Sequence, residues 1–201
     1  AEQVFVATEN TTVKEVCEQH GIHVLMTSGT CLTGTDRIAE CAQQMDADVF
    51  VNVQGDEPVF DPCDLKVMLE AAERYPNEVL NGVCELHAED QYRLGSIPKA
   101  VMRLDGRLLY MSRSGIPSTK SHEFVKSWRQ VCAYAFPRKS LECYGKNARK
   151  TPLEQIEDIE ILRLLELGWD VRMIPLSGQS MAVDTPEDVE RVRMFIQQRD
   201  M

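Results

Sequence analysis

The chain has 201 residues and a formal net charge of -10, with 43% hydrophobic and 27% charged residues. This length and balance predict one globular domain with a substantial core, and the negative charge disfavours nucleic acids and anionic membranes as partners. No run of eighteen apolar residues and no signal-peptide pattern is found, so we expect a cytoplasmic protein that does not contact a membrane.

Seven cysteines are scattered along the chain without a C-x-x-C pair. An odd, dispersed set fits neither a disulfide framework nor a zinc site, so free thiols in a reducing compartment are expected. The four histidines are dispersed as well, and no H-E-x-x-H motif is present. A histidine metal site is therefore not expected.

The first part of the chain alternates between strand and helix patterns. Strands are predicted over residues 4–7, 22–26 and 49–53, and a helix capped at Thr11-Thr12 separates the first two. A polar loop over residues 27–35 opens a second helix before the third strand. This order favours parallel strands with right-handed crossovers and therefore an α/β layer fold.

The rest of the chain continues in the same style. Asp61-Pro62 is a helix start, with proline at the first helical position, and Asp105-Gly106 is a tight turn that predicts a hairpin. Further strands are predicted over 78–86, 99–103, 107–111, 130–136 and 171–174, and helices over 153–167 and 186–198. We expect one domain over residues 1–201, within which residues of about 80–135 could form a smaller lobe.

The central candidate site follows the strand over residues 49–53. A nearly all-apolar strand is buried on both faces, so the turn at Gly55-Asp56 would emerge where the sheet meets solvent. Asp184 also follows a short apolar segment and precedes a proline turn. Two such carboxylates at one sheet edge would suit magnesium, although each residue could instead be an ordinary turn or loop aspartate.

Two arginine motifs are weaker candidates. Arg37 lies in the first turn of the helix that Gly34 and Thr35 open, where the helix dipole disfavours a cation. Its partner could be an anionic ligand or a carboxylate such as Asp36 or Glu40. Arg113, between two serines after a strand, could grip a carboxylate or a polyol.

An acidic cluster begins the helix predicted over residues 153–167. A solvated face favoured by the helix dipole explains most of these carboxylates. Glu157 and Glu160 would share a helical face and could instead point into a cleft.

Taken together, these motifs resemble the 3-deoxy-manno-octulosonate (Kdo) cytidylyltransferases, relatives of the CMP-acylneuraminate synthetases. The resemblance spans roughly residues 4 to 195 and keeps the family's order of motifs. The segments that carry it are residues 34–40, 51–58, 110–117, 153–157 and 183–188, of which the second and the last are the most specific.

The resemblance implies a Rossmann-like nucleotidyltransferase fold with a mostly parallel central sheet flanked by helices, usually as a homodimer. It further implies that CTP and an ulosonic acid react to give the CMP-sugar, for surface polysaccharide synthesis, and pyrophosphate. By motif, Asp56 and Asp184 would be catalytic and hold Mg²⁺, and Gly34, Thr35 and Arg37 would border the nucleotide. Gln54, Arg113, Glu160 and Tyr134 would face the sugar acid.

Two departures from the family pattern bear on these expectations. The chain opens at what resembles the family's second strand, without the first strand and the basic loop that cradles the triphosphate, and we expect an incomplete amino end. Residues 129–134 differ from the His-x-Gly-x-Tyr pattern of the sugar pocket, and Gly115 stands where a proline is common. The sugar could therefore be another ulosonic acid, including an amino-substituted or nine-carbon one.

Three alternatives stay open at this point. The chain could be a nucleotidyltransferase that uses another base. It could be a non-catalytic sugar-nucleotide-binding homologue, given the absent phosphate loop. It could also be a metal-dependent glycosyltransferase, because those enzymes place aspartates at strand ends as well.

Overall fold

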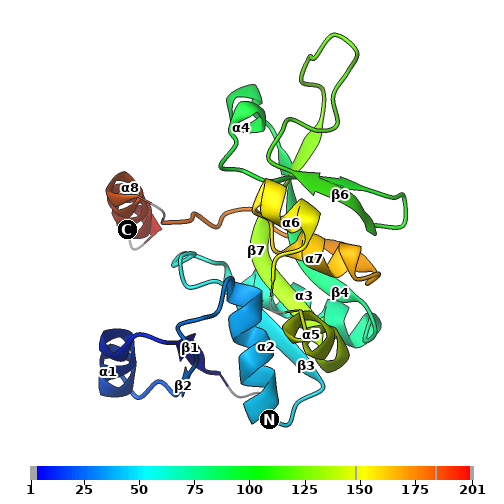
Figure 1. The fold of residues 1–201 in the computed structure, drawn as a ribbon. Helices are drawn as coiled ribbons and strands as arrows, with labels where there is room; N and C mark the ends of the chain where they lie inside the picture. Colours follow the sequence, from blue (N-terminus) through cyan, green and yellow to red (C-terminus); the bar gives the residue numbers. More distant parts are fainter. Residues whose placement is uncertain (1–3, 148, 184, 200–201) are drawn as a thin grey trace. The chain divides into compact units, whose positions relative to one another are not determined.

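A computed structural model describes residues 4–147, 149–183 and 185–199 (Figure 1). The described residues form two compact units, the first from Ala1–Phe50 and Pro137–Gly168 and the second from Val51–Phe136 and Trp169–Met201. Each unit therefore combines two separate segments of the chain. The single domain over residues 1–201, with a smaller lobe at about 80–135, stays a prediction.

The first unit begins with a small parallel sheet of β1 (Val6–Thr8) and β2 (Val24–Met26), joined by α1 (Thr11–Gln19). The side chain of Asn10 caps α1 because its Oδ1 accepts hydrogen bonds from the backbone N–H groups of Thr12 and Val13, at 2.8 and 3.2 Å. The predicted cap at Thr11-Thr12 is therefore wrong by one position.

Two helices of the first unit, α2 (Gly34–Gln44) and α5 (Arg138–Gly145), lie side by side (Figure 1). Arg138 joins them, because its guanidinium donates to the carbonyls of Ala42 and Ala47 at 2.9 and 2.8 Å and to that of Met45. A cation at these terminal carbonyls complements the negative end of the α2 dipole. Helix α5 was not predicted from the sequence.

The helix predicted over residues 153–167 is two helices, α6 (Pro152–Glu157) and α7 (Ile161–Glu166). Asp158 ends α6 in the left-handed conformation, with φ at 52°. A left-handed residue cannot continue a right-handed helix, so the predicted common face of Glu157 and Glu160 is wrong.

The second unit is built around a six-stranded sheet with the order β6-β5-β7-β4-β8, in which β3 also pairs with β7. The strands of this sheet are β3 (Val49–Val53), β4 (Val79–Leu86), β5 (Lys99–Met102), β6 (Leu108–Ser112), β7 (Ser127–Pro137) and β8 (Val171–Pro175). Strand β8 is parallel to β4, whereas β4–β7, β5–β7 and β5–β6 are antiparallel.

The α/β fold is confirmed, but the prediction of a mostly parallel sheet is wrong. The sheet is mixed because β5 and β6 form the hairpin predicted at Asp105-Gly106, where Gly106 has φ of 86°, and because β7 runs antiparallel to β4. The sequence pattern of a strand does not state its direction in the sheet.

Helices and a buried core complete the second unit. Helix α3 (Pro62–Arg74) packs against β4 and β8 and starts at its predicted cap, Asp61, whose side chain accepts from the Cys63 N–H at 2.8 Å. The other helices are α4 (Glu89–Arg93), which was not predicted, and α8 (Pro186–Arg199). Among the described residues, no helix is long and apolar enough to cross a membrane.

Candidate functional site

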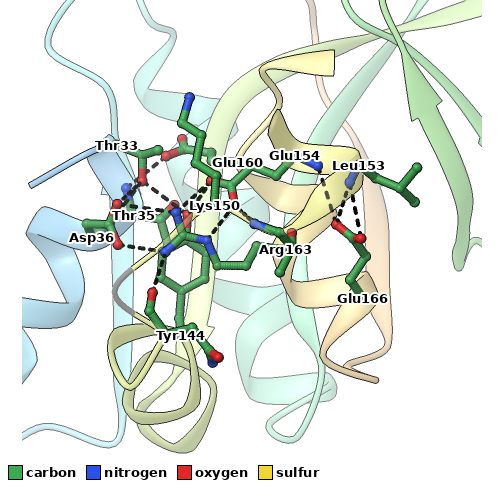
Figure 2. A network of polar contacts seen from close by, with 12 residues as sticks. Thr33, Thr35, Asp36, Tyr144, Lys150, Leu153, Glu154, Glu160, Arg163 and Glu166 are labelled. Carbon is green, nitrogen blue, oxygen red and sulfur yellow. Dashed lines mark hydrogen bonds and ion pairs between the residues drawn. The ribbon is translucent and has the colours of Figure 1, made fainter. Parts of the chain in front are cut away.

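The first turn of α2 lies in a network of polar contacts (Figure 2). Thr33 caps the helix, because its Oγ1 accepts from the Asp36 N–H at 3.1 Å. The carboxylate of Glu160 accepts from the Thr35 N–H at 2.8 Å. Thr33 and Glu160 thus satisfy two N–H groups that a helix start leaves without intrahelical partners, and they fix the Gly34-Thr35 segment.

Arg163 holds this network together from a fully buried position. Its Nε and Nη2 bind the two oxygens of Glu154 at 2.6 and 2.7 Å, and its Nη1 binds Asp36 at 2.8 Å. The guanidinium also lies 3.9 Å from the ring centroid of Tyr144. Burial opposes the charge on Arg163, but the hydrogen bonds to Glu154 and Asp36 outweigh it and raise the pKa of the guanidinium.

Tyr144 remains a neutral hydroxyl in this network because burial raises the pKa of its side chain far above the ordinary value. It lies 3.1 Å from the hydroxyl of Thr33 and donates to Glu154 at 3.4 Å. Residues of α2, α5, α6 and α7 therefore meet around one buried guanidinium. Sequence reasoning missed Arg163 and Tyr144, and it placed Glu154 in an acidic cluster explained mostly as a solvated face, whereas Glu154 is 0% exposed. The only sequence signal for Arg163 is a cation inside an apolar helical stripe.

Arg37 has the carboxylate partner that its position in the first turn of α2 requires. It contacts the carboxylate of Glu9, and its Nη1 donates to Thr27 Oγ1 at 2.5 Å. The partners considered from the sequence are engaged elsewhere, Asp36 with Arg163 and Glu40 with the backbone N–H of Ser28. Arg37 is thus anchored to the β1–α1 connection and to the loop after β2, within the same unit.

In the second unit, β3 leads into the turn predicted to be the centre of the site. The Gln54 N–H donates to the Cys132 carbonyl at 3.2 Å, and Gly55 and Asp56 are exposed. The Asp56 carbonyl accepts from the Val183 N–H at 2.8 Å, which brings the segment before α8 against this turn. Asp184, the predicted partner of Asp56, lies outside the described residues.

Glu57, which sequence reasoning did not select, is the buried neighbour of Asp56. Its side chain is buried, and burial raises the pKa of its carboxyl, an effect that nearby Arg129 partly offsets. Its Oε2 has no hydrogen-bond partner among the residues that the structure describes. The turn therefore presents one exposed carboxylate, on Asp56, and one buried carboxyl.

The predicted sugar residues of the second unit occupy two places. Arg113 is half-buried, and its Nη1 donates to the Gly95 carbonyl at 3.1 Å. Tyr134 is 2% exposed, and its hydroxyl accepts from Gln130 Nε2 at 3.2 Å. The same Nε2 donates to the buried Asn81 Oδ1 at 2.9 Å. Gln130 and Asn81 were not selected from the sequence, although Gln130 stands in the segment that departs from the family pattern.

The orientation of the Gln130 amide follows from its neighbours. Asn81 Nδ2 donates to the carbonyls of Val131 and Ala133, both at 3.0 Å, so Asn81 Oδ1 must be the atom that faces Gln130. Gln130 must then offer its Nε2 to that oxygen. This orientation also places the Gln130 Nε2 toward the Tyr134 hydroxyl.

The predicted site residues are thus divided between the two units. Gly34, Thr35, Arg37 and Glu160 belong to the first unit, where Glu160 and Thr35 are in direct contact. Gln54, Asp56, Arg113 and Tyr134 belong to the second unit. Their roles in binding or catalysis stay predictions.

Comparison with known proteins decides the family. The family model described as cytidylyltransferase matches residues 1–173. The chain belongs to the cytidylyltransferase family. This cytidylyltransferase is 37% identical over 200 residues to the 3-deoxy-manno-octulosonate cytidylyltransferase of Myxococcus xanthus, covering 98% of the chain and 80% of that protein. It is 31% identical to that of Escherichia coli over 196 residues, 98% and 79% of the two chains.

A solved structure agrees with the sequence comparisons. A CMP:2-keto-3-deoxy-manno-octonic acid synthetase complexed with CTP matches the cytidylyltransferase described above with a TM-score of 0.91 and 30% identity, covering 99% of this chain and 82% of that one. The nucleotidyltransferase fold and the family resemblance predicted from the motifs are confirmed.

Proposed function

We propose that this cytidylyltransferase joins CTP to an ulosonic acid of the Kdo type, giving the CMP-sugar and pyrophosphate. The observation that carries the proposal is the exposed Asp56 turn at the end of β3, against which the Val183 N–H bond brings the segment that precedes Asp184. The relatives named above are Kdo cytidylyltransferases, which supports CTP and an eight-carbon sugar acid as substrates.

A magnesium ion is part of this proposal. The chemistry of the donor set fits Mg²⁺, because Asp56 is a carboxylate on an exposed turn and Asp184 follows Val183 directly in the sequence. Two carboxylates leave room for the phosphate oxygens and waters that complete magnesium coordination. When bound, the ion would neutralise charge on the triphosphate.

The chain's own residues would position the two substrates. Gly34, Thr35 and Arg37 would border the nucleotide, and the anchoring of Arg37 by Glu9 and Thr27 keeps its guanidinium in one place. Arg113 would bind the sugar carboxylate through its planar N–H donors. Gln54, Tyr134 and Glu160 complete the proposed set of sugar-facing residues.

The reaction requires positioning and charge stabilisation. The anomeric oxygen of the sugar acid would attack the α-phosphorus of CTP as the bond to the β-phosphate oxygen breaks. Pyrophosphate leaves, and the hydroxyl proton passes to solvent. No covalent intermediate with the protein is needed.

We further propose that the enzyme acts as a homodimer in the cytoplasm. The homodimer rests on the family resemblance. The compartment is supported by the cysteines, all seven of which are free thiols, as expected in a reducing environment. Sedimentation of the purified protein would test the dimer.

A pyrophosphate-release assay over CTP, UTP, GTP and ATP, each with a panel of ulosonic acids, tests the proposal. We expect turnover with CTP, and loss of turnover in Asp56→Asn and Asp184→Asn with unchanged circular dichroism. Asp46→Asn, at a fully exposed aspartate, is the control for removal of one negative charge.

A purine preference would overturn the assignment of the base. Binding of CMP-sugar without turnover would favour a sensor, and cleavage of a sugar nucleotide without pyrophosphate would favour a glycosyltransferase.

A further inference from the structure

Lys99 is a fully buried lysine at the start of β5. Its Nζ donates to the backbone carbonyls of Leu94, Ile97 and Arg113, at 2.8, 2.6 and 2.5 Å. An ammonium group has three N–H donors, so these three carbonyls use its full donor capacity. Lys99 therefore ties the turn over residues 94–97 to the segment that follows β6.

Burial of a lysine is costly, because its ammonium group is removed from water. Hydrogen bonds to the two segments that Lys99 joins offset this cost. Leu94, Ile97 and Arg113 all lie outside regular strands and helices, so their carbonyls are not paired in a strand ladder, and the Leu94 carbonyl accepts one backbone hydrogen bond, from the Ile97 N–H at 3.3 Å. A single long, charged side chain supplies donors to all three from one position.

Arg113 is held twice by this arrangement. Lys99 pairs with Ser112 across the β5–β6 ladder, and its ammonium binds the carbonyl of the next residue, Arg113. The guanidinium of Arg113 in turn donates to the Gly95 carbonyl, inside the turn that Lys99 also binds. The backbone and the side chain of Arg113 are thus both fixed through the turn over residues 94–97.

We propose that Lys99 is a positioning residue for the acidic substrate, acting through Arg113. Lys99 is itself fully buried, so its effect on binding passes through the contacts that orient the Arg113 guanidinium toward the sugar carboxylate. This inference rests on the proposed function, in which Arg113 binds that carboxylate. A guanidinium that is displaced by about an ångström loses much of its binding and orienting power.

The test compares Lys99→Met with the wild-type protein in the pyrophosphate-release assay. We expect the KM for the ulosonic acid to rise about tenfold or more, while the KM for CTP changes less than about twofold. Lys66→Met, which removes an exposed lysine from α3, is the matched control and should leave both values unchanged. Should Lys99→Met fail to fold, Lys99→Gln keeps two N–H donors on a shorter side chain and is expected to raise the same KM.

A double-mutant cycle separates positioning from general stability. In an Arg113→Ala background, Lys99→Met should raise the sugar KM by less than about twofold, because the group through which it acts is gone. Additive effects, or equal increases in the two KM values, would overturn the role of Lys99 and leave the proposed function intact. A wild-type protein that releases no pyrophosphate with any ulosonic acid would overturn both.

Discussion

The carboxylate of Glu160 accepts a hydrogen bond from the Thr35 N–H at 2.8 Å, in the first turn of α2. Thr35 is 1% exposed, so water has little access to that N–H group if the carboxylate is removed. A negative charge at this position also complements the positive end of the helix dipole. A residue that the family resemblance assigns to the sugar thus has a structural task in the segment that we propose borders the nucleotide.

We therefore expect Glu160→Ala to lower the free energy of unfolding by about 1–3 kcal/mol, because the Thr35 N–H is left buried and unpaired. Glu160→Gln, which keeps an acceptor oxygen, should cost less. Urea denaturation measures both, and Glu142→Ala, at an exposed glutamate of α5, is the control. Equal stability of Glu160→Ala and Glu142→Ala would contradict this structural role.

The pairing of Arg163 with Glu154 gives a second prediction. Both side chains are 0% exposed. Arg163→Met should lower the free energy of unfolding by about 3–5 kcal/mol, because the Glu154 carboxylate stays buried without its cation. Arg163→Met combined with Glu154→Leu should cost less than Arg163→Met alone, since the fully buried carboxylate is then removed together with its cation and only the partly exposed Asp36 loses an ion-pair partner.

Chemical denaturation of these two variants, beside Arg149→Met at an exposed arginine, makes the measurement. The control should change stability by no more than about 0.5 kcal/mol. If the double variant were less stable than Arg163→Met, the destabilisation would arise from lost packing of the two side chains.

The lowered pKa of the Glu78 carboxyl makes the free energy of unfolding depend on pH. Burial raises its pKa, but the hydrogen bonds from Arg172 and Arg107 outweigh burial and lower it below the ordinary 4.5. A carboxyl whose pKa is lower in the folded state adds stability above its unfolded pKa, and that stability is lost as the pH falls through the folded pKa. The loss from this group should therefore begin below about pH 4.5.

Urea midpoints of the wild type and Glu78→Gln, measured from about pH 7 to about pH 3, test this dependence. The variant should be less stable near neutral pH, and the difference should shrink as the pH falls. Glu70→Gln, at an exposed glutamate of α3, is the control. A constant difference over the whole range would show that titration of Glu78 is not its cause.

Local signals in the sequence predicted much of the fold. The Asp61-Pro62 start of α3 and the Asp105-Gly106 turn between β5 and β6 depend on neighbouring residues alone, and both are confirmed. The break between α6 and α7 was not predicted, because the apolar spacing continues across it and only the left-handed φ of Asp158 interrupts the helix.

The exposed turn at Asp56 was predictable because it directly follows a strand. The contacts between distant segments were less predictable. Asp36 and Arg163 are 127 residues apart in the sequence, and Arg37 finds its carboxylate at Glu9 on the preceding β1–α1 connection. No periodicity encodes such partners, because they result from tertiary packing. The same reason explains why the direction of β7, and with it the mixed sheet, was missed.

Gly115, which stands where the family usually has a proline, leaves room for the side chain of Tyr92. A Cβ atom at Gly115 would lie 2.6 Å from Tyr92 Cζ, and Tyr92 is itself 1% exposed, with its hydroxyl donating to the Pro117 carbonyl at 3.1 Å. The ring of Tyr92 is attached to α4 at one end and hydrogen-bonded through its hydroxyl at the other, so it cannot move aside without losing that hydrogen bond. Gly115→Ala should therefore cost about 1–3 kcal/mol of unfolding free energy.

Gly95→Ala is the matched control for this substitution, because a Cβ atom there meets no heavy atom within 4 Å. It should be neutral or stabilising by up to about 1 kcal/mol, since alanine restricts the unfolded chain more than glycine does. Tyr92→Leu should reduce the cost of Gly115→Ala, so that the two changes together cost less than their sum in thermal denaturation. Strict additivity would mean that the ring of Tyr92 does not exclude a side chain at position 115, and the tie between these two residues would then have to be abandoned.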